Sequence, residues 1–582
     1  MQPVDFTTLT AICGELRQNW LPARLEQVYQ RDRHTLAIAL RTLQGRGWLT
    51  LCWHPQAAHL CLGDPPPRDP DTFTFSQQLQ HQLNGLALVE IATIAPWERA
   101  IDLKFARRPD DPILWHLYTE IMGKYSNVIL VNREGLIVTA AHQVSSQQSR
   151  VRPILTGQPY EPPPTLLDAI PTAQESLARW QERVSLLPGP IKRNLLKTYR
   201  GLSSALVVSM LQEAGLDPEQ ATDRLQTEDW QRLFHRWQEW LQSLDRGTFS
   251  PGWTRSGYTV LGWQRVSPVE TVQQIIQSYY GQQLNQQRFE QVHHQLGQKL
   301  KILLEKLNQK KTTFRNRLQQ SEGADCYREQ ADLLMAHLHH WQPGMTTIEL
   351  PDFMTGDPVS ISLNPEKNAV QNAQAFYKQH QKLKRARTAV LPLLAAVEAE
   401  IQYLEQVEAS LTQMDRYQTS ADLPALEEIR DELIQQGYLE ASGYRSRMET
   451  NDSGIDFHRY RTPSNFELLV GRNNRQNDQL TFRLAGDYDL WFHTQEIPGS
   501  HVLLRLEPGA VPEKVDLQFA ADLAAYYSRG RLSEQVPIVY TEPRHVYKPK
   551  GAKPGMAIYK QERILWGRPQ GAATYLSRGL EA

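Results

Sequence analysis

The stretch Glu467–Asn477, ELLVGRNNRQN, decides how this chain is interpreted. A short apolar run, Leu468–Val470, stops at Gly471, and six polar residues follow it. Neither strand alternation nor an amphipathic helix produces such a polar run, so we predict a loop at a strand end. Amide and guanidinium groups donate hydrogen bonds, and arginine forks match phosphates and base edges. An ordinary polar surface loop is the alternative. The residues assigned to nucleic-acid contact are Arg472, Asn473, Asn474, Arg475 and Asn477.

A second polar segment, Asp489–His501, reads DLWFHTQEIPGSH. Trp491 is close in sequence to His493 and His501, and a tryptophan with two imidazoles suits stacking on bases or ribose, as in single-stranded RNA sites. The spacing matches no His/Asp metal motif, and Pro498-Gly499 indicates a turn. These three aromatic residues are therefore further candidates for RNA contact. A buried tryptophan with hydrogen-bonded core histidines is the alternative.

A third segment, Arg544–Gly555, reads RHVYKPKGAKPG and concentrates positive charge. Between Thr541 and Gln570 there are seven Lys or Arg residues and two acids, although the net charge of the chain is −1. Prolines and glycines between the lysines predict a stiff loop, which suits binding to a phosphodiester backbone with strong salt dependence. A solubilising surface is the alternative. The residues assigned to RNA contact here are Arg544, Lys548, Lys550 and Lys553.

Length and composition limit the classes of function. The 582 residues exceed what one core usually holds, so we expect several structural units. The four cysteines form no C-x-x-C pair, which excludes a zinc ribbon of ordinary spacing and gives no disulfide framework. No phosphate-binding glycine loop or nucleophile elbow occurs, so no catalytic residue, metal or cofactor is predicted. The chain shows no signal-peptide pattern and no apolar run of about 18 residues, so we expect a cytoplasmic protein without a membrane partner.

The first half of the chain divides into two predicted domains. Residues 1–168 combine a helical pattern from Phe6 to Asn19 with short alternating strands, and the prolines Pro162–Pro164 end this part. Residues 169–265 have a helical pattern. Two of these helices, joined by Arg200–Ser203, resemble a helix-hairpin-helix unit, whose glycine turn often faces phosphates. Plain helical packing explains the pattern equally well.

Residues 266–451 carry two runs of apolar residues at alternating spacings of three and four, beginning at Phe289 and Ala369. Such spacing predicts a coiled-coil seam. Two runs in one chain favour an intramolecular antiparallel arm over self-dimerisation, with a reach of roughly 60 Å. A small tip at about 321–363 is expected to contain a short helix and a β-hairpin.

The last domain, residues 452–570, returns to an α/β pattern, and a tail, 571–582, follows it. Leu480–Leu484 and His501–Leu506 alternate as strands do, and a helix is expected to carry Phe519. The predicted fold class is therefore multidomain α+β.

The three polar segments, in this order, resemble the RNA-binding domain of the NFACT family. In the N-terminal domain, Glu120–Asn127 reads EIMGKYSN, after a helix expected from Pro112, and is similar to the family signature E-[IL]-M-G-[RK]-x-S-N. Trp97-Glu98-Arg99 stands where the family has an Asp-Arg pair for tRNA binding, with a glutamate one methylene longer. The resemblance assigns tRNA binding to Glu98, Arg99, Glu120 and Met122.

The family's N-terminal fold is similar to that of formamidopyrimidine-type DNA glycosylases, so the resemblance implies a glycosylase-like α/β domain followed by a helix-hairpin-helix, a long coiled-coil arm and a C-terminal α/β domain. Glycosylase chemistry is not expected. Those enzymes need an N-terminal proline followed by glutamate, whereas here Gln2 precedes Pro3 and Val4 follows it, and no zinc ligands occur.

The resemblance implies a ribosome quality-control factor. Such a protein binds a stalled 50S subunit that carries nascent peptidyl-tRNA, through rRNA and ribosomal proteins near the stalk base. It recruits tRNA, in this family tRNA-Ala, for untemplated C-terminal tailing of the nascent chain. The ribosome performs the peptidyl transfer, so the protein is not expected to be an enzyme. A fibronectin-binding surface adhesin, the activity that gave part of the family its name, is the alternative, and the lack of a signal peptide disfavours it.

Overall fold

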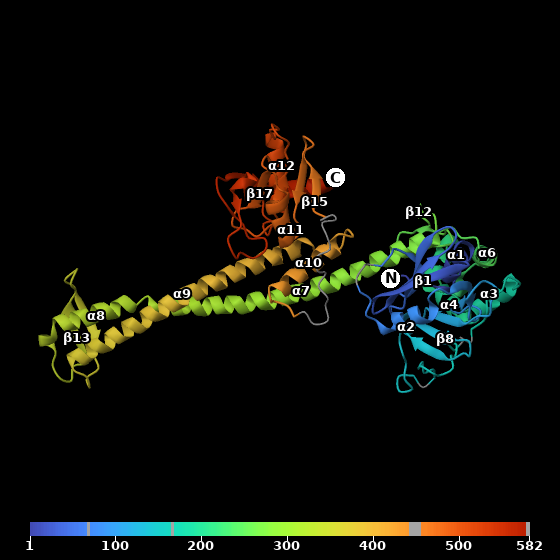
Figure 1. Ribbon diagram of the computed structural model, residues 1–582, viewed down its shortest axis with the longest axis horizontal. Helices are drawn as coiled ribbons and strands as arrows, with labels where there is room; N and C mark the ends of the chain where they lie inside the picture. The colour runs from blue at the N-terminus through green and yellow to red at the C-terminus, as the bar shows by residue number, and fades with distance from the viewer. Residues whose placement is uncertain (67–69, 150, 165–167, 441–455, 578–582) are drawn as a thin grey trace. The chain divides into compact units, whose positions relative to one another are not determined.

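The computed structural model describes residues 1–66, 70–149, 151–164, 168–440 and 456–577 (Figure 1). The chain forms two units, Met1–Leu284 and Asn285–Ala582. The finer division into domains that the sequence predicts stays a prediction, and its boundary at 451/452 and the end of its tail, 578–582, lie outside the described residues. None of the described helices is long and apolar enough to cross a membrane.

The first unit contains a nine-stranded sheet of antiparallel pairs, in the order β4-β3-β2-β1-β5-β6-β7-β8-β9. The first four strands, β1 to β4, confirm the short alternating strands predicted within residues 1–168. The bounds are β1 (Ala23–Asp32), β2 (Thr35–Arg41), β3 (Arg46–Cys52), β4 (His59–Gly63), β5 (Ala87–Thr93), β6 (Ala100–Ala106), β7 (Trp115–Glu120), β8 (Asn127–Asn132) and β9 (Ile137–Ala140).

The prediction of a helix from Pro112 is wrong. The segment that precedes Ile121 is strand β7, which pairs with β6 on one side and β8 on the other. Its sequence, WHLYTE, carries two aromatic residues and a threonine, which favour a pleated and half-buried surface.

Helices α1 (Phe6–Trp20) and α2 (Thr74–Leu83) contribute to the core of this sheet. Asp5 caps α1, because its carboxylate accepts a hydrogen bond from the amide of Thr8. The first turns of α7 (Val272–Ser321), including Ile275 and Tyr280, belong to the same core.

The helical part of the first unit has a tryptophan-rich core. Its helices are α3 (Leu177–Ser185), α4 (Ile191–Thr198), α5 (Ser204–Glu213) and α6 (Thr227–Arg246). Trp180, Trp237 and Trp240 are fully buried between them. A three-stranded sheet of β10 (Gly252–Trp253), β11 (Tyr258–Thr259) and β12 (Ser267–Pro268) follows. The two helices predicted around Gly201 are confirmed as α4 and α5.

In the second unit, α7 and α9 (Ala369–Gln413) lie side by side (Figure 1). They run in opposite directions, because His293 bonds to the carbonyl of Leu411 while Arg315, further along α7, pairs with Glu398, earlier on α9. The seam buries five residues of the run that begins at Phe289 and three of the run that begins at Ala369: Phe289, Val292, Leu296, Leu300, Leu307, Val397, Ile401 and Leu404. It also buries Leu304, and Leu303 lies half-buried beside it.

The predicted tip contains the expected helix and hairpin. Helix α8 (Ala324–Ala336) packs against α9, and a short 3-10 turn, η3 (Leu338–His340), follows it. Strands β13 (Thr347–Pro351) and β14 (Pro358–Ser362) form the hairpin.

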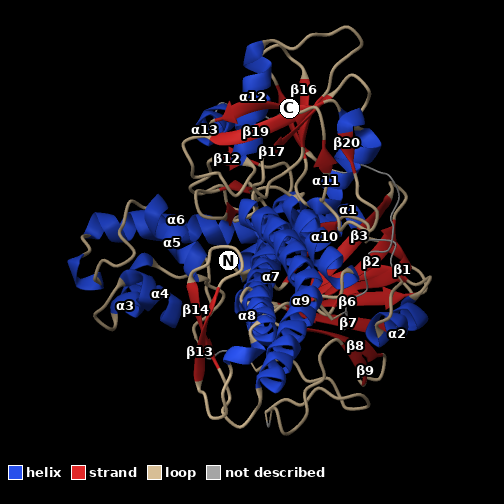
Figure 2. Cartoon of the chain, turned by 90° about the vertical axis from the view of Figure 1, so that its left-hand side faces the viewer, coloured by secondary structure: helices blue, strands red, loops and turns tan. Residues whose placement is uncertain are grey.

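Beyond α10 (Asp422–Gln435), the C-terminal part of the unit is built on a sheet with the order β15-β16-β18-β17-β19-β22. Every pairing between neighbouring strands in it is antiparallel. Helix α12 packs on one face, and α13 packs on α12 (Figure 2). The bounds are β15 (His458–Arg461), β16 (Glu467–Val470), β17 (Leu490–Thr494), β18 (Val502–Leu504), α12 (Lys514–Tyr526), β19 (Val536–Thr541), β22 (Arg563–Gly567) and α13 (Pro569–Ser577).

Two predictions about this domain are wrong. The polar run after Gly471 is a short helix, α11 (Asn474–Gln479), and not a loop, because the side chain of Asn473 caps it by accepting from the amide of Gln476. Leu480–Leu484, predicted as a strand, is a π-helical turn, η4, that continues from α11. Apolar residues alternate with polar ones in this segment, but they do not share a buried face. Leu480 is buried, whereas Phe482 and Leu484 are exposed.

Candidate nucleic-acid interface

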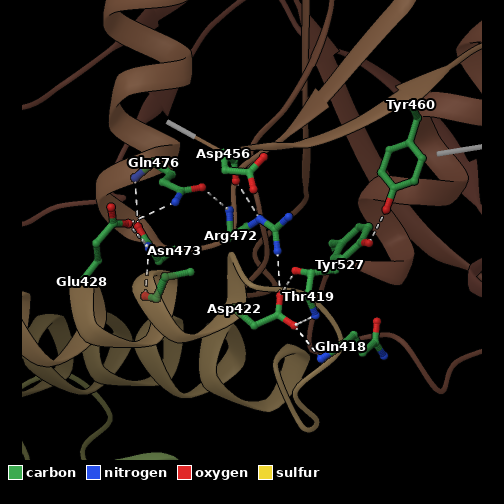
Figure 3. A network of polar contacts seen from close by, with 11 residues as sticks. Gln418, Thr419, Asp422, Glu428, Asp456, Tyr460, Arg472, Asn473, Gln476 and Tyr527 are labelled. Atoms are coloured by element: carbon green, nitrogen blue, oxygen red, sulfur yellow. Dashed lines mark hydrogen bonds and ion pairs between the residues drawn. The ribbon is translucent and has the colours of Figure 1, made fainter. Parts of the chain in front are cut away.

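Arg472, predicted to contact RNA, is buried against another part of its own chain (Figure 3). Its Nη1 lies 2.9 Å from Oδ1 of Asp422 at the start of α10. Its Nε donates to the carbonyl of Asp456 at 2.7 Å. The guanidinium is thus engaged by a buried carboxylate and not by solvent.

The amide side chains that follow also contact α10. Nδ2 of Asn473 donates to Glu428 at 2.6 Å, and Nε2 of Gln476 donates to the same carboxylate at 3.0 Å (Figure 3). Nδ2 of Asn474 donates to Oε1 of Glu432 at 3.0 Å. Burial raises the pKa of Glu432, and the hydrogen bond from Asn474 opposes that shift. We call this set of contacts between Arg472–Gln476 and α10 the polar dock.

The remaining two residues of this group are less engaged with α10. Asn477 is buried, and its Oδ1 accepts from the backbone amide of His501 at 3.0 Å. Arg475 is half-buried. The structure thus places the five predicted RNA-contact residues of this segment at an internal interface or close to it, and their RNA contact stays a prediction.

Trp491, His493 and His501 occupy the positions described by the alternative interpretation, a tryptophan with core histidines. Trp491 is 1% exposed, and its Nε1 donates to Thr481 at 3.0 Å. The hydroxyl of Thr481 lies 2.7 Å from Nδ1 of His501, and Nε2 of His493 lies 3.2 Å from the carbonyl of Gly499. Burial lowers the pKa of His493 to about 4 and lowers that of His501 well below its usual value. Both imidazoles are therefore neutral near pH 7.

The basic segment lies mostly between β20 (Val546–Tyr547) and β21 (Ile558–Tyr559), after the 3-10 turn η5 (Pro543–His545). Arg544 pairs with Glu542, and Lys548 pairs with Asp478. Lys550 is exposed.

Lys553 differs from the other cations of this segment. Its Nζ donates to the hydroxyl of Tyr438 and lies 4.5 Å from the ring centroid of Tyr403 and 4.6 Å from that of Tyr438. Burial lowers its pKa. This lysine thus extends the contacts of the domain with the end of α9 and the segment after α10.

In the first unit, the segment Trp97-Glu98-Arg99 adjoins the turn between α4 and α5. Trp97 has a φ of 64°, which is rare for a bulky residue. The centroid of its ring lies 4.7 Å from that of Phe6 and 5.5 Å from that of Trp240. A Cβ on Gly201 would lie 2.6 Å from this ring, so the glycine allows the two segments to meet. The turn at Gly201 is therefore a neighbour of the segment that holds Glu98 and Arg99, whose tRNA binding stays a prediction.

Glu98 and Arg99 are both half-buried. One carboxylate oxygen of Glu98 is buried and has no hydrogen-bond partner among the described residues. Nη1 of Arg99 lies 3.5 Å from the carbonyl of Val4, and its backbone carbonyl accepts from the amide of Ile121 at 2.8 Å. The two predicted segments, 97–99 and 120–127, are thus joined through the backbone.

Glu120, predicted to bind tRNA, is 1% exposed and pairs with Arg152 through two contacts of 2.9 and 2.5 Å. The hydroxyl of Tyr160 donates to the same carboxylate at 2.8 Å. Met122 is half-buried, and its amide donates to Ser126 at 2.8 Å. Glu120 is therefore held inside the domain, and its contact with tRNA stays a prediction.

Sequence reasoning missed two sets of partners. Arg152 and Tyr160 lie more than thirty residues after Glu120, and no spacing links them to it. The acids of α10, by contrast, were visible as ALEEIRDE, a helix with charge opposite to that of RNNR. Complementary charge between the two segments was the available signal.

Comparison with known proteins assigns most of the chain to one family. The family model "NFACT N-terminal and middle domains" matches residues 5–451, and the family model "NFACT protein RNA binding domain" matches residues 456–560. This chain is therefore a multidomain protein with an RNA-binding domain in its C-terminal part. The chain belongs to the NFACT family.

Similar proteins span nearly the whole chain. The "Rqc2 homolog RqcH" of Streptococcus suis (strain 05ZYH33) is 30% identical over 567 residues, which cover 95% of each chain. The protein of the same name from Bacillus subtilis (strain 168) is 26% identical over 573 residues, 95% of this chain and 96% of that one. This relationship supports a role in ribosome quality control.

Solved structures similar to parts of the chain include the C-terminal part of the fibronectin/fibrinogen-binding protein from Streptococcus suis, with 30% identity, a TM-score of 0.38 and coverage of 51% of this chain and 100% of that one. The N-terminal part of that protein matches with 22% identity, a TM-score of 0.39 and coverage of 48% and 98%.

Proposed function

We propose that this protein binds stalled 50S ribosomal subunits that carry peptidyl-tRNA, and recruits tRNA for untemplated C-terminal tailing of the nascent chain. By resemblance the recruited tRNA is tRNA-Ala. Two observations support the proposal. The chain matches both NFACT family models in the order that the family has them, and relatives named RqcH align with 95% of its length.

The features of each unit support separate tasks. In the first unit, the ring of Trp97 packs against the turn at Gly201, and Glu98 and Arg99 are the next two residues of that segment. In the second unit, the α7–α9 pair forms the arm and the β20–β21 segment carries exposed positive charge. We assign tRNA to the first place and ribosomal RNA, with proteins near the stalk base, to the arm and the basic segment. The ribosome supplies the peptidyl transfer, so the protein acts in the cytoplasm as a binding factor and not as an enzyme.

Gradient sedimentation tests the ribosome part. Lysates in which ribosomes have been stalled are expected to show the tagged protein with 50S subunits and not with intact 70S ribosomes. The control is a lysate without stalling, in which the 50S-bound fraction falls. Equal binding to both particles would contradict the proposal.

Sequencing of co-purified RNA and mass spectrometry of stalled nascent chains test the tRNA part. Enrichment of one tRNA species together with matching C-terminal tails is expected. Arg99→Ala should abolish both, whereas Arg133→Ala, at an exposed residue of the same unit, should not. An even distribution of tRNA species would contradict selective recruitment while leaving 50S binding intact.

A further inference from the structure

The edge strand of the C-terminal sheet presents apolar side chains to solvent. Among the described residues, strand β22 pairs with β19 on one side and with no strand on the other. Leu565 packs toward the core of α12, so Ile564 and Trp566 point to the opposite face of the sheet. Ile564 is 52% exposed and Trp566 is 57% exposed. A large aromatic ring in this position is unusual for a surface with no partner.

A second exposed pair lies on the hairpin of β20 and β21. Tyr547 and Ile558 face each other across this hairpin, and they are 44% and 52% exposed. The neighbouring residues Val546 and Tyr559 pack on the buried side, in one cluster with Val539 of β19. Val539 is the direct partner of Ile564 in the sheet. The hairpin therefore covers the same sheet face on which Ile564 and Trp566 remain open. We call Tyr547, Ile558, Ile564 and Trp566 the open apolar surface.

Cations border this surface. Nζ of Lys560 lies 5.7 Å from the ring centroid of Tyr547. Lys550 is exposed on the loop before β21. Part of the basic excess that the sequence shows between Thr541 and Gln570 thus lies beside an exposed ring of this surface.

Cations beside exposed aromatic and aliphatic side chains favour one class of ligand. Phosphates favour the cations, and unpaired bases offer apolar faces that stack on aromatic rings, at a gain of ~1–3 kcal/mol per base. Paired bases in a duplex have their faces stacked within the helix and offer only phosphates and groove edges. Aromatic rings also anchor protein interfaces, so docking of an acidic protein is the outcome from which the test below distinguishes RNA binding.

The backbone of the surface is held in place before any ligand binds. Nε2 of Gln518 on α12 donates to the carbonyl of Trp566 at 2.8 Å. The amide of Lys560 donates to the carbonyl of His545 at 3.0 Å, which ties the hairpin to η5. A preformed surface loses little conformational entropy when RNA stacks on it.

We propose that the open apolar surface binds unpaired RNA nucleotides, with bases stacked on Trp566 and Tyr547 and phosphates near Lys550 and Lys560. The proposal rests on the proposed function, because it names the RNA-facing surface of the same domain and the class of RNA that this surface takes. It moves this role away from the polar dock, whose side chains contact α10.

The test measures affinity of the full-length protein for two labelled probes, an unstructured RNA of about 12 nucleotides and a duplex RNA of about 12 base pairs. Trp566→Ala is expected to weaken binding of the unstructured probe by at least about fivefold and binding of the duplex by less than about twofold. Trp566→Phe, which keeps a stacking ring, should restore most of the loss. Tyr488→Ala removes an aromatic residue that is 59% exposed elsewhere in the domain and should leave both affinities unchanged.

Three results overturn the inference. One is unchanged binding of the unstructured probe by Trp566→Ala. Another is equal loss for the two probes. The third is wild-type RNA affinity combined with lost binding to a purified ribosomal protein, which would make the surface a protein-docking site. In each case wild-type binding to stalled 50S subunits would leave the proposed function intact. Absence of 50S binding by the wild-type protein would instead overturn the proposed function.

Discussion

The guanidinium of Arg472 lies 2.9 Å from the carboxylate of Asp422, and both side chains are buried. Asp422 also accepts from the backbone amides of Gln418 and Thr419, both at 2.7 Å, so it fixes the start of α10 as well as the polar dock. The residue that made the sequence look like a nucleic-acid site is therefore the anchor of an internal interface.

Loss of either partner should weaken this interface strongly. Arg472→Ala leaves a buried carboxylate without its cation, and we expect a cost of about 3–5 kcal/mol. Asp422→Ala should cost a similar amount, and the double variant should cost less than the sum, because neither charge is then left alone. Denaturant unfolding measures the free energies, and hydrogen exchange of α10 shows whether the loss is local.

The matched control for this prediction is Arg459→Ala. Arg459 pairs with Glu467 at 2.7 Å in the same domain, but at the surface, where an ion pair contributes at most about 1 kcal/mol. Equal effects of the two alanine variants would contradict a role for Arg472 as an anchor.

Glu120→Gln separates a structural role from a tRNA-binding role. Removing the negative charge leaves Arg152 nearly buried without a carboxylate, so we expect a loss of about 3 kcal/mol in the free energy of unfolding. Glu134→Gln, at an exposed pair with Arg133, should change stability by less than about 0.5 kcal/mol. A stable Glu120→Gln protein that has lost tRNA binding would contradict the structural role.

The arm offers a test with neighbouring residues. Leu304→Asp places a charge in the buried seam and should destabilise the α7–α9 pair by several kcal/mol. Leu303→Asp, at a half-buried position, should cost less, and Ile302→Asp, which is exposed, should cost little. Circular dichroism during thermal unfolding measures the order of the three variants. Equal stability of Leu304→Asp and Ile302→Asp would contradict the observed seam.

The sequence predicts features that depend on neighbouring residues better than contacts between segments that are far apart in the chain. The α7–α9 seam follows from local spacing, so the two apolar runs are enough to predict it, although the structure buries Leu304 and leaves Leu303 half-buried. The partner of Arg472 depends on charge alone, and a fork of donors suits a carboxylate as well as a phosphate. The polar run therefore predicts that an acidic group is bound, but not that the group lies on the chain's own α10.

The buried histidines predict a pH dependence of stability. His493 has a folded pKa of about 4, below its unfolded value of about 6.5, because burial disfavours the charged ring. The folded protein is therefore destabilised as the pH falls from 6.5 toward 4, and the loss of stability reaches about 2 kcal/mol at pH 5. Denaturant midpoints at pH 7 and 5 measure it. The variant His493→Gln should show a weaker dependence, whereas His339→Gln, at an exposed position of the tip, should match the wild type.

The last prediction distinguishes two lysines of the basic segment that the sequence treats alike. Lys550 is exposed, so its ammonium is available to a phosphate, and Lys550→Ala should reduce the slope of log affinity against log salt by about one unit. Lys553 contacts the hydroxyl of Tyr438 and the rings of Tyr403 and Tyr438. Lys553→Ala should therefore leave the salt slope nearly unchanged and lower the denaturant midpoint instead.

Both lysine variants are measured on the full-length protein, with one RNA at four or more salt concentrations and with denaturant unfolding in parallel. Lys560→Ala serves as a further comparison, because Lys560 is exposed but already lies over the ring of Tyr547. It should lose affinity for RNA without a change in midpoint. If Lys550→Ala and Lys553→Ala reduce the salt slope equally, then Lys553 leaves the tyrosines to meet a phosphate, and its contact with Tyr438 belongs only to the RNA-free protein.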